Sequence, residues 1–348
     1  MGLFERLFGR KAAVGPAPSP AVVAVPNATA PAPAAVPPPA LSREEVLEAL
    51  QLELPAQPPA PADPALVARI LEEFLRTRPV PASPPQLAMR ILNLIAEPDP
   101  DPNALAKLIA LEPALTASVL RLASSAVNRG VEKIENLRDA ITRLGMREVA
   151  NVCGALSARS VFAPKRRAEQ AKHGAAFAEL FVHASATALA ASALAFSMPK
   201  LKVRSDVVFL SALLHDIGMS VGLGVLAGFP AESVPAMGKD ELQTVLDAVH
   251  GEIGVEIHRE WKLPEAAQQI CQQHHHSGAA LAGAGAELHL VRLTSAVQLL
   301  LAFPANEARV QEALESAQAL GLSRFALRSF AGDVRRFIET ARSLGNPG

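Results

Sequence analysis

The side chains of this chain that are best suited to chemistry are its histidines. Nine occur among the 348 residues, at His173, His183, His215, His250, His258, His274, His275, His276 and His289. Imidazole nitrogens bind zinc, iron and manganese, often together with a carboxylate oxygen. A lone histidine usually needs only a hydrogen-bond partner or water, so the grouping of these residues carries the argument.

One pair of neighbours, His215 and Asp216, joins an imidazole to a carboxylate. The pair follows the apolar run Val207 to Leu214, which is typical of a buried helix, and precedes Ile217-Gly218, which predicts a helix stop. Two such side chains at a helix end can turn towards one cation. The dipeptide therefore predicts one side of a metal site.

Further histidines lie in or at the ends of other predicted helices. His183 lies within a stretch of small and apolar residues, which is an unusual place for an unpaired imidazole. His250 begins the segment His-Gly-Glu-Ile-Gly, and His274 to His276 end a later helix. Ligands that come from four separate helices are what a metal site inside a helical bundle requires.

The elements that must position these residues are predicted to be helices throughout. Half of the residues are apolar, alanine is abundant, and no stretch alternates with the period of two that is typical of strands. Asp63-Pro64 and Asp101-Pro102 are helix-start signals that precede apolar residues at helical spacing. Helical patterns continue to about Ala158, and then around 168–198, 205–217, 240–260, 264–275, 286–303, 306–320 and 323–344. We therefore predict an all-α protein with a helical domain at 63–345.

The N-terminal region, residues 1–62, has a different composition. It holds 13 of the 29 prolines, and proline removes a backbone donor, so we expect a disordered Pro/Ala-rich tail. One short helix is predicted within it, because Ser42 and Glu45 form a capping-box pattern. Residues 1–11 place leucine and phenylalanine on one helical face beside basic residues. Such a segment either docks on a partner or a membrane surface, or frays because two turns are too short for a stable helix.

Charge and cysteine content narrow the classes of function. The chain has 33 basic and 34 acidic residues, which argues against direct nucleic-acid binding through a broad basic surface. Two cysteines cannot build a disulfide framework and the N-terminus lacks a signal-peptide pattern, so we expect a cytoplasmic protein. The stretch Leu180 to Pro199 carries no Lys, Arg, Asp or Glu, but its many alanines predict a buried helix and no transmembrane segment.

Around its histidines the sequence resembles the HDOD (HD-related output domain) group of the HD superfamily, and the resemblance covers about residues 79–300. The most specific segment is Ala212-Leu-Leu-His-Asp-Ile-Gly218, which is similar to the family signature Gly-Leu-Leu-His-Asp-Ile-Gly. Further similar segments follow the family's order: Pro79–Pro85, Leu108–Leu115, Val119–Ser125, Ile134–Gly145, His183–Ser185, His250–Gly254, Trp261–Pro264 and His274–His275. The resemblance implies an HD-superfamily helical bundle with a signalling role of the bacterial type.

The resemblance implies three parts of the helical domain and a set of candidate metal ligands. An N-terminal helical subdomain is expected at about 63–165, an HD-like subdomain at about 166–300, and C-terminal helices at about 304–345. An iron, manganese or zinc ion would be held by the candidate ligands His183, His215, Asp216, His250, His274 and His275. HD phosphohydrolases typically complete this site with an aspartate on a later helix, and here Ser295 takes that place. A neutral hydroxyl is a far poorer metal ligand than a carboxylate.

Three functions remain open on these residues. We favour a regulatory output or protein-interaction module without catalytic residues, which binds a metal or a phosphate-bearing ligand and an unidentified signalling protein. The alternative is a metal-dependent phosphohydrolase or phosphodiesterase that acts on a nucleotide or a cyclic dinucleotide. The third is a purely structural helical protein whose histidines are relics. The loss of a carboxylate at Ser295 weighs against an enzyme, and the six retained candidate ligands weigh against the third function.

Overall fold

Every regular element is a helix in the part of the chain that the structure describes, namely residues 41–53, 61–81, 83–125, 134–302 and 306–345 of a computed structural model. Residues 39–348 form one compact unit. The expectations for residues 1–11 and for the disordered tail up to residue 40 lie outside the described residues. The prediction of an all-α protein is confirmed.

Sixteen α-helices and three short 3-10 helices follow one another in the described residues. The α-helices are α1 (Arg43–Leu50), α2 (Pro64–Thr77), α3 (Gln86–Ile95), α4 (Pro102–Ala110), α5 (Pro113–Ser124), α6 (Leu137–Leu144), α7 (Met146–Ser157), α8 (Arg159–Phe162), α9 (Arg167–Ser197), α10 (Ser205–Leu214), α11 (Ile217–Gly228), α12 (Lys239–Glu260), α13 (Glu265–Gln273), α14 (Ala286–Ala302), α15 (Glu307–Ala319) and α16 (Arg324–Gly345). The 3-10 helices are η1 (Pro199–Leu201), η2 (Ala231–Ser233) and η3 (Gly278–Leu281).

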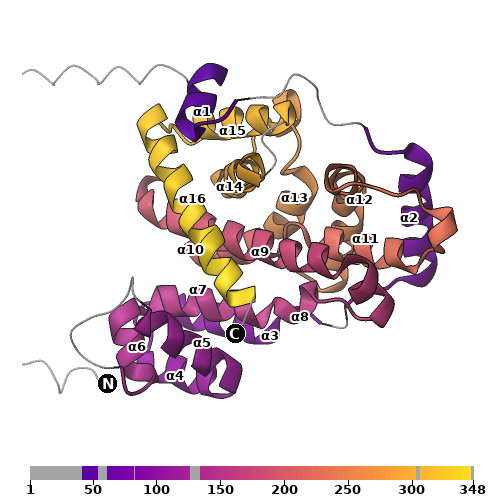
Figure 1. Cartoon of the computed structure of the whole chain (residues 1–348). Coiled ribbons are helices and arrows are strands. Elements are labelled where there is room, and N and C mark those ends of the chain that lie inside the picture. Colours follow the sequence, from indigo (N-terminus) through magenta and orange to yellow (C-terminus); the bar gives the residue numbers. More distant parts are fainter. Residues whose placement is uncertain (1–40, 54–60, 82, 126–133, 303–305, 346–348) are drawn as a thin grey trace, which may run out of the picture. The chain divides into compact units, whose positions relative to one another are not determined.

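Helices α3 to α7 pack around a small core of their own, in the lower part of Figure 1. Asp101 caps α4 with its side chain, as its sequence pattern predicts. Ile91, Leu105 and Val149 are fully buried in this core. The remaining helices surround a second, larger core, and α7 against α9 and α3 against α10 join the two.

Helix α2 does not belong to the N-terminal subdomain that we expected at 63–165. It packs against α11 and α12, and Figure 1 shows it at the far side of the molecule from α4. Its buried residues Leu66, Ile70 and Phe74 belong to the larger core. The predicted helix start at residue 63 is correct for α2, but α2 belongs to the larger core. Helical periodicity does not reveal which partner covers an apolar face.

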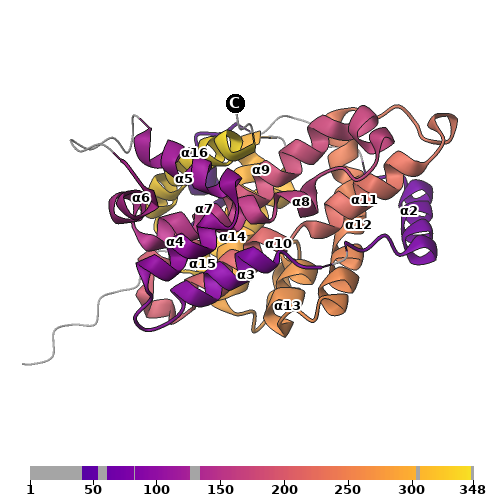
Figure 2. The same ribbon diagram turned by 90° about the horizontal axis from the view of Figure 1, so that it is seen from below.

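The 31-residue helix α9 is the centre of the larger core. It packs against α10, α11, α14 and α16, and in the view from below in Figure 2 it lies between α16 and α11. Alanine and serine fill its buried face from Ala184 to Ser192, and such small side chains let the neighbouring helices approach closely. Two stretches, Arg167–Ser197 and Ser205–Gly228, are long and apolar enough to cross a membrane. In each of them 78% of the apolar window is buried inside the protein.

Helix α11 was not predicted, because the sequence Ile217-Gly218 is typical of the end of a helix. The preceding helix α10 does end at Leu214, but a new helix begins at Ile217 after only two residues. Glycine at position 218 serves an approach to α12 and does not end a helix, as shown below. The expected stop is therefore half correct.

Helix α1 corrects the expected tail at 1–62. Ser42 and Glu45 form the predicted capping box, with the Ser42 amide donating to Glu45 Oε2 over 2.8 Å and the Glu45 amide donating to Ser42 Oγ over 3.2 Å. Val46 and Leu50 are fully buried, and the helix packs against α15 and α16. Residues 41–53 are thus part of the packed unit, because the apolar face of this capped helix joins the larger core.

If α1 is part of the core, truncation of Leu50 must create a cavity. We expect Leu50→Ala to lower the free energy of unfolding by about 2–5 kcal/mol. Leu75→Ala on α2 is the matched control, because Leu75 is 61% exposed and its truncation leaves no cavity. Urea unfolding followed by circular dichroism measures both. Equal effects of the two substitutions would show that α1 is not docked.

Candidate metal centre

The connection between α10 and α11 places a carboxylate at the centre of the larger core. His215 is the C-cap of α10 and Asp216 is the N-cap of α11, so both side chains leave the backbone between two helix ends. Both are buried, with 0% and 2% of their surface exposed. A buried carboxylate needs partners that compensate its charge.

Four histidines from four elements surround the Asp216 carboxylate. Oδ2 lies 3.2 Å from His183 Nε2 and 3.3 Å from His215 Nε2. Oδ1 lies 3.2 Å from His274 Nε2 and 3.6 Å from His250 Nε2. We call Asp216 and these four histidines the Asp216 cluster. The structure thus brings together five of the six candidate ligands around one carboxylate, with His275 beside them.

Backbone carbonyls fix the ring orientation of three of these histidines. His215 Nδ1 lies 2.6 Å from the Ala212 carbonyl, His250 Nδ1 lies 2.9 Å from that of Asp247, and His274 Nδ1 lies 3.0 Å from that of Ile270. A carbonyl only accepts, so each Nδ1 carries the proton. The lone pair of each neutral ring is then on Nε2, which faces Asp216.

This arrangement fits a metal ion better than a hydrogen-bond network. The carboxylate oxygens of Asp216 accept protons, and in these neutral tautomers the facing Nε2 atoms of His215, His250 and His274 have none to give. Both Asp216 oxygens and the Nε2 atoms of His215 and His274 accordingly lack a hydrogen-bond partner although they are buried. Three oriented imidazoles and a carboxylate are a donor set for zinc, iron or manganese.

Burial and neighbouring groups together shift the pKa values of Asp216, His183 and His274. Burial by itself would raise the pKa of Asp216, but the neighbouring histidines, His215 foremost, hold the pKa of this carboxyl well below its usual range. Burial also lowers the pKa of His183, against the pull of Asp216, and lowers that of His274 to about 3. These shifts favour neutral His183 and His274 beside an ionised Asp216, which are the forms that bind a metal.

Ser295 on α14 takes the place of the aspartate that the resemblance to HD phosphohydrolases implies. Its hydroxyl oxygen is 3.4 Å from His183 Nε2, and its side chain is 1% exposed. The position therefore faces the Asp216 cluster, but it supplies a neutral oxygen. On the side of His183 and His215, Asp216 is the one carboxylate among the described residues.

Glycine at position 218 brings the two halves of the Asp216 cluster together. A Cβ atom at Gly218 would lie 2.0 Å from the His250 carbonyl oxygen and 2.7 Å from the Gly254 nitrogen. Helices α11 and α12 thus cross with their backbones almost in contact. This crossing places Asp216, at the start of α11, against His250 on α12.

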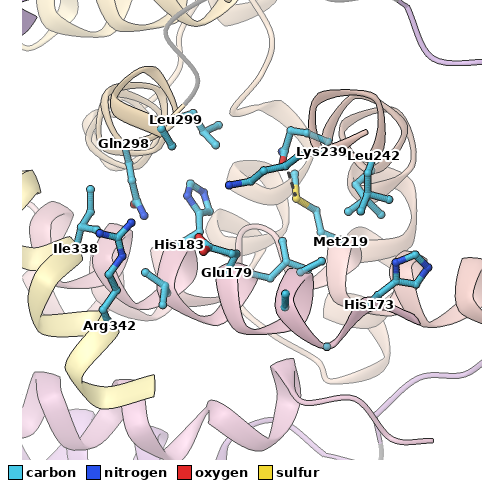
Figure 3. Close-up of a pocket in the computed structure, with 18 of the residues that line it drawn as sticks. His173, Glu179, His183, Met219, Lys239, Leu242, Gln298, Leu299, Ile338 and Arg342 are labelled. Carbon is cyan, nitrogen blue, oxygen red and sulfur yellow. Dashed lines mark hydrogen bonds between the residues drawn. The ribbon is translucent and has the colours of Figure 1, made fainter. Parts of the chain in front are cut away.

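A cavity of about 900 Å³ opens beside the Asp216 cluster, between α9, α12, α14 and α16. Among the candidate ligands, His183 alone lines it. Figure 3 shows His183 pointing into the cavity from α9, with Gln298 and Arg342 on one side and Lys239 on the other. A ligand in the cavity would therefore meet the Asp216 cluster at His183.

Three residues beside the site were not identified from the sequence. Arg309 and Glu312 on α15 and Asp247 on α12 form an ion-paired group next to His275. Arg309 and Glu312 are three residues apart, which is a typical spacing of exposed ion pairs on a helix surface. The sequence therefore does not reveal that the two residues are only 5% and 3% exposed. Of the other histidines, His173 lines the cavity at a distance from the Asp216 cluster. His258 contacts the carbonyl of Leu214, the residue before His215.

The HDOD domain family model matches residues 82–277, more than half of the chain. The chain belongs to the HDOD family. No curated protein matches it.

Solved structures from several organisms are similar to this chain. A protein from Marinobacter aquaeolei VT8, described as a signal transduction protein, is 20% identical, with 87% of this chain and 65% of that chain covered and a TM-score of 0.51. An HDOD domain protein of unknown function from Geobacter sulfurreducens is also 20% identical, with coverage of 80% and 98% and a TM-score of 0.50. A Shewanella amazonensis SB2B protein, provisionally named a metal-dependent phosphohydrolase, is 19% identical, with coverage of 74% and 98% and a TM-score of 0.48. At these identities the first two similarities show a shared fold alone.

The crossing at Gly218 predicts a large difference between two glycines. We expect Gly218→Ala to destabilise the protein by at least about 1–3 kcal/mol, because the new methyl group meets backbone atoms that cannot turn away. Gly251→Ala on α12 is the control, since nothing lies within 4 Å of a Cβ atom there. Urea unfolding compares the two variants with wild type. A Gly218→Ala variant as stable as Gly251→Ala would contradict the tight crossing.

His258 predicts a dependence of stability on pH. It is fully buried, its Nε2 donates to the Leu214 carbonyl over 3.2 Å, and burial lowers its pKa from 6.5 to about 4. Between these values the unfolded chain binds a proton at this residue and the folded chain does not. Stability is therefore complete above about pH 6.5 and falls, by about 3 kcal/mol for this residue, as the pH drops towards 4.

His258→Gln isolates this contribution, because glutamine keeps an N–H donor and does not titrate. We expect the free energy of unfolding of the variant to change less between pH 6.5 and 4 than that of wild type. Urea unfolding at several pH values provides the comparison. Parallel pH profiles would mean that His258 is already accessible to protons in the folded state.

Proposed function

We propose that this chain is a cytoplasmic, bacterial-type signalling protein whose Asp216 cluster binds a divalent metal and carries out no hydrolysis. One observation carries the proposal: imidazole lone pairs, held by backbone carbonyls, face Asp216, while a serine occupies the place of the second carboxylate. The first feature favours metal binding. The second weighs against catalysis.

His183, His215, Asp216, His250 and His274 would hold the metal, with iron, manganese or zinc as the ions that suit such donors. His275 is the sixth candidate ligand and is considered separately below. When bound, the metal would supply a local positive charge that attracts an anionic ligand. The chain's own contribution is orientation, since burial and backbone acceptors hold the imidazoles in place before any ion arrives.

The cavity beside His183 suggests how a ligand would reach the site. Arg342 and Lys239 flank His183, and aliphatic side chains such as Leu242 and Ile338 line the walls between them. These residues would bind and orient a phosphate-bearing ligand at the exposed edge of the Asp216 cluster. The same opening is the observation that favours the alternative, a phosphohydrolase, because a substrate would need it too.

Signalling would work through the helices that carry the cluster. Helix α9 holds His183 and also packs against α7 of the N-terminal core and against α16. An ion or ligand that tightens α9 would bias the packing of both neighbours, and a signalling protein could sense this. We propose such a protein as the partner, and no direct contact with nucleic acid.

A comparison of wild type with Ser295→Asp and His215→Ala/Asp216→Ala tests the proposal. We expect wild type to bind a divalent metal, the double variant to bind it at least about 100-fold more weakly, and Ser295→Asp to bind it more tightly. Wild type should not hydrolyse nucleotides or cyclic dinucleotides. Metal content after desalting and product formation by chromatography are the measurements.

The controls separate ligand loss from misfolding. His276→Ala removes an exposed imidazole from the same histidine run and should bind metal like wild type. Circular dichroism checks that the double variant folds, and hydrogen exchange should show slower exchange in α9 and α7 once metal is added. Hydrolysis by wild type at ordinary enzymatic rates of about 1–10³ s⁻¹, lost in the double variant, would establish the phosphohydrolase.

A further inference from the structure

His275 differs from the other candidate ligands in what its ring nitrogens face. In His215, His250 and His274 a backbone carbonyl accepts from Nδ1, which leaves Nε2 free for an ion. In His275 the Nδ1 atom contacts Arg309 Nη1, and Nε2 lies 3.3 Å from the same nitrogen. No carbonyl contact orients this ring among the described residues.

A guanidinium can only donate, so His275 must be the acceptor. A neutral imidazole has a single lone pair, on either Nδ1 or Nε2. Arg309 Nη1 contacts Nδ1 more closely than does Glu312 Oε1, which lies 3.3 Å from the same nitrogen, so the lone pair is on Nδ1 and the proton on Nε2. The lone pair that a metal would require at His275 is therefore already used.

Arg309 is held firmly in this place. It is 5% exposed, Nη1 lies 2.8 and 2.9 Å from the two carboxylate oxygens of Glu312, and Nη2 lies 2.5 Å from Asp247 Oδ2. Asp247 lies on the same helix as His250, and its carbonyl accepts from the His250 ring. Arg309 is thus tied to the helix that presents a ligand.

The position of Arg309 also matters for charge. The ligand atoms of Asp216, His250, His274 and His275 lie within 4.8 Å of one another, and would otherwise suit a cation of their own. His183, His215 and Asp216 form a second group of the same kind. Asp247 and Glu312 balance the charge of Arg309 at longer range, but its Nη1 is the charged atom in contact with the His275 ring and opposes a cation that would bind there.

We propose that Arg309 removes His275 from the ligand set and takes the place of a second cation, so that the centre holds one metal per chain. This inference rests on the proposed metal binding at the Asp216 cluster. It makes Arg309 a positioning and specificity residue that sets the number of ions without touching them.

The test counts metal ions in the purified full-length chain. Metal is removed with a chelator, Co²⁺ is titrated back, and its visible absorption together with elemental analysis after desalting gives the number bound. We expect one Co²⁺ per wild-type chain, and the same number with unchanged affinity for His275→Ala. We expect Arg309→Gln to bind a second Co²⁺ that disappears again in Arg309→Gln/His275→Ala, whereas Arg309→Lys keeps the charge and stays at one.

Each contrary result has a distinct meaning. Two ions in wild type, with one lost in His275→Ala, would overturn the inference and leave the proposed metal binding intact. No ion in wild type would overturn the inference together with the proposed function. One ion in a folded Arg309→Gln variant would show that the guanidinium does not exclude a second cation. If that variant fails to fold by circular dichroism, the wild-type and His275→Ala counts decide the matter by themselves.

Discussion

The arrangement of this protein depends on a buried carboxylate to which three of the four neighbouring histidines offer no proton. Asp216 is almost completely shielded from water, and removing an isolated charge from water is unfavourable unless other groups compensate it. The nearest side chains are imidazoles, and those of His215, His250 and His274 turn their protons towards backbone carbonyls. The compensation that this geometry invites is a positive ion between the carboxylate and the rings, and the surrounding helices serve to hold these groups in place.

The helices meet this demand through their ends and their small residues. His215 and Asp216 occupy the short connection between α10 and α11, and His274 caps the end of α13. Gly218 permits the approach of α11 to α12, and Gly254 faces Cys271 so closely that a Cβ atom there would lie 2.5 Å from its sulfur. Packing and chemistry are therefore coupled, because the residues that let the helices cross also set the distances among the ligands.

Much of this arrangement could be predicted from the sequence, for local reasons. Capping residues such as Ser42 and Asp101 act within one turn, so their patterns identified helix starts correctly. The dipeptide His215-Asp216 stood out because neither residue suits an apolar run. Helix α11 was missed because glycine at position 218 usually signals a stop, and its actual contact is with a residue 32 positions away, at His250.

The remaining features depend on long-range contacts that local patterns do not contain. The docking of α2 and α1 is decided by apolar faces elsewhere in the chain. Arg309 pairs with Glu312 one turn away, as many exposed residues do, and only the fold shows that both are buried beside His275. The sequence thus identified most groups that could bind an ion, but not the charge that stands next to them.

The use of backbone carbonyls to orient His215, His250 and His274 has a consequence for substitutions around the centre. A main-chain oxygen is present whatever the side chain at that position, so substitutions at Ala212, Asp247 or Ile270 leave the acceptor in place. The orientation of each ligand ring is thereby independent of the side chain at the acceptor position, whereas the group that position 295 offers to an ion depends entirely on the side chain there. The geometry of the centre and the charge that it offers can therefore be altered separately.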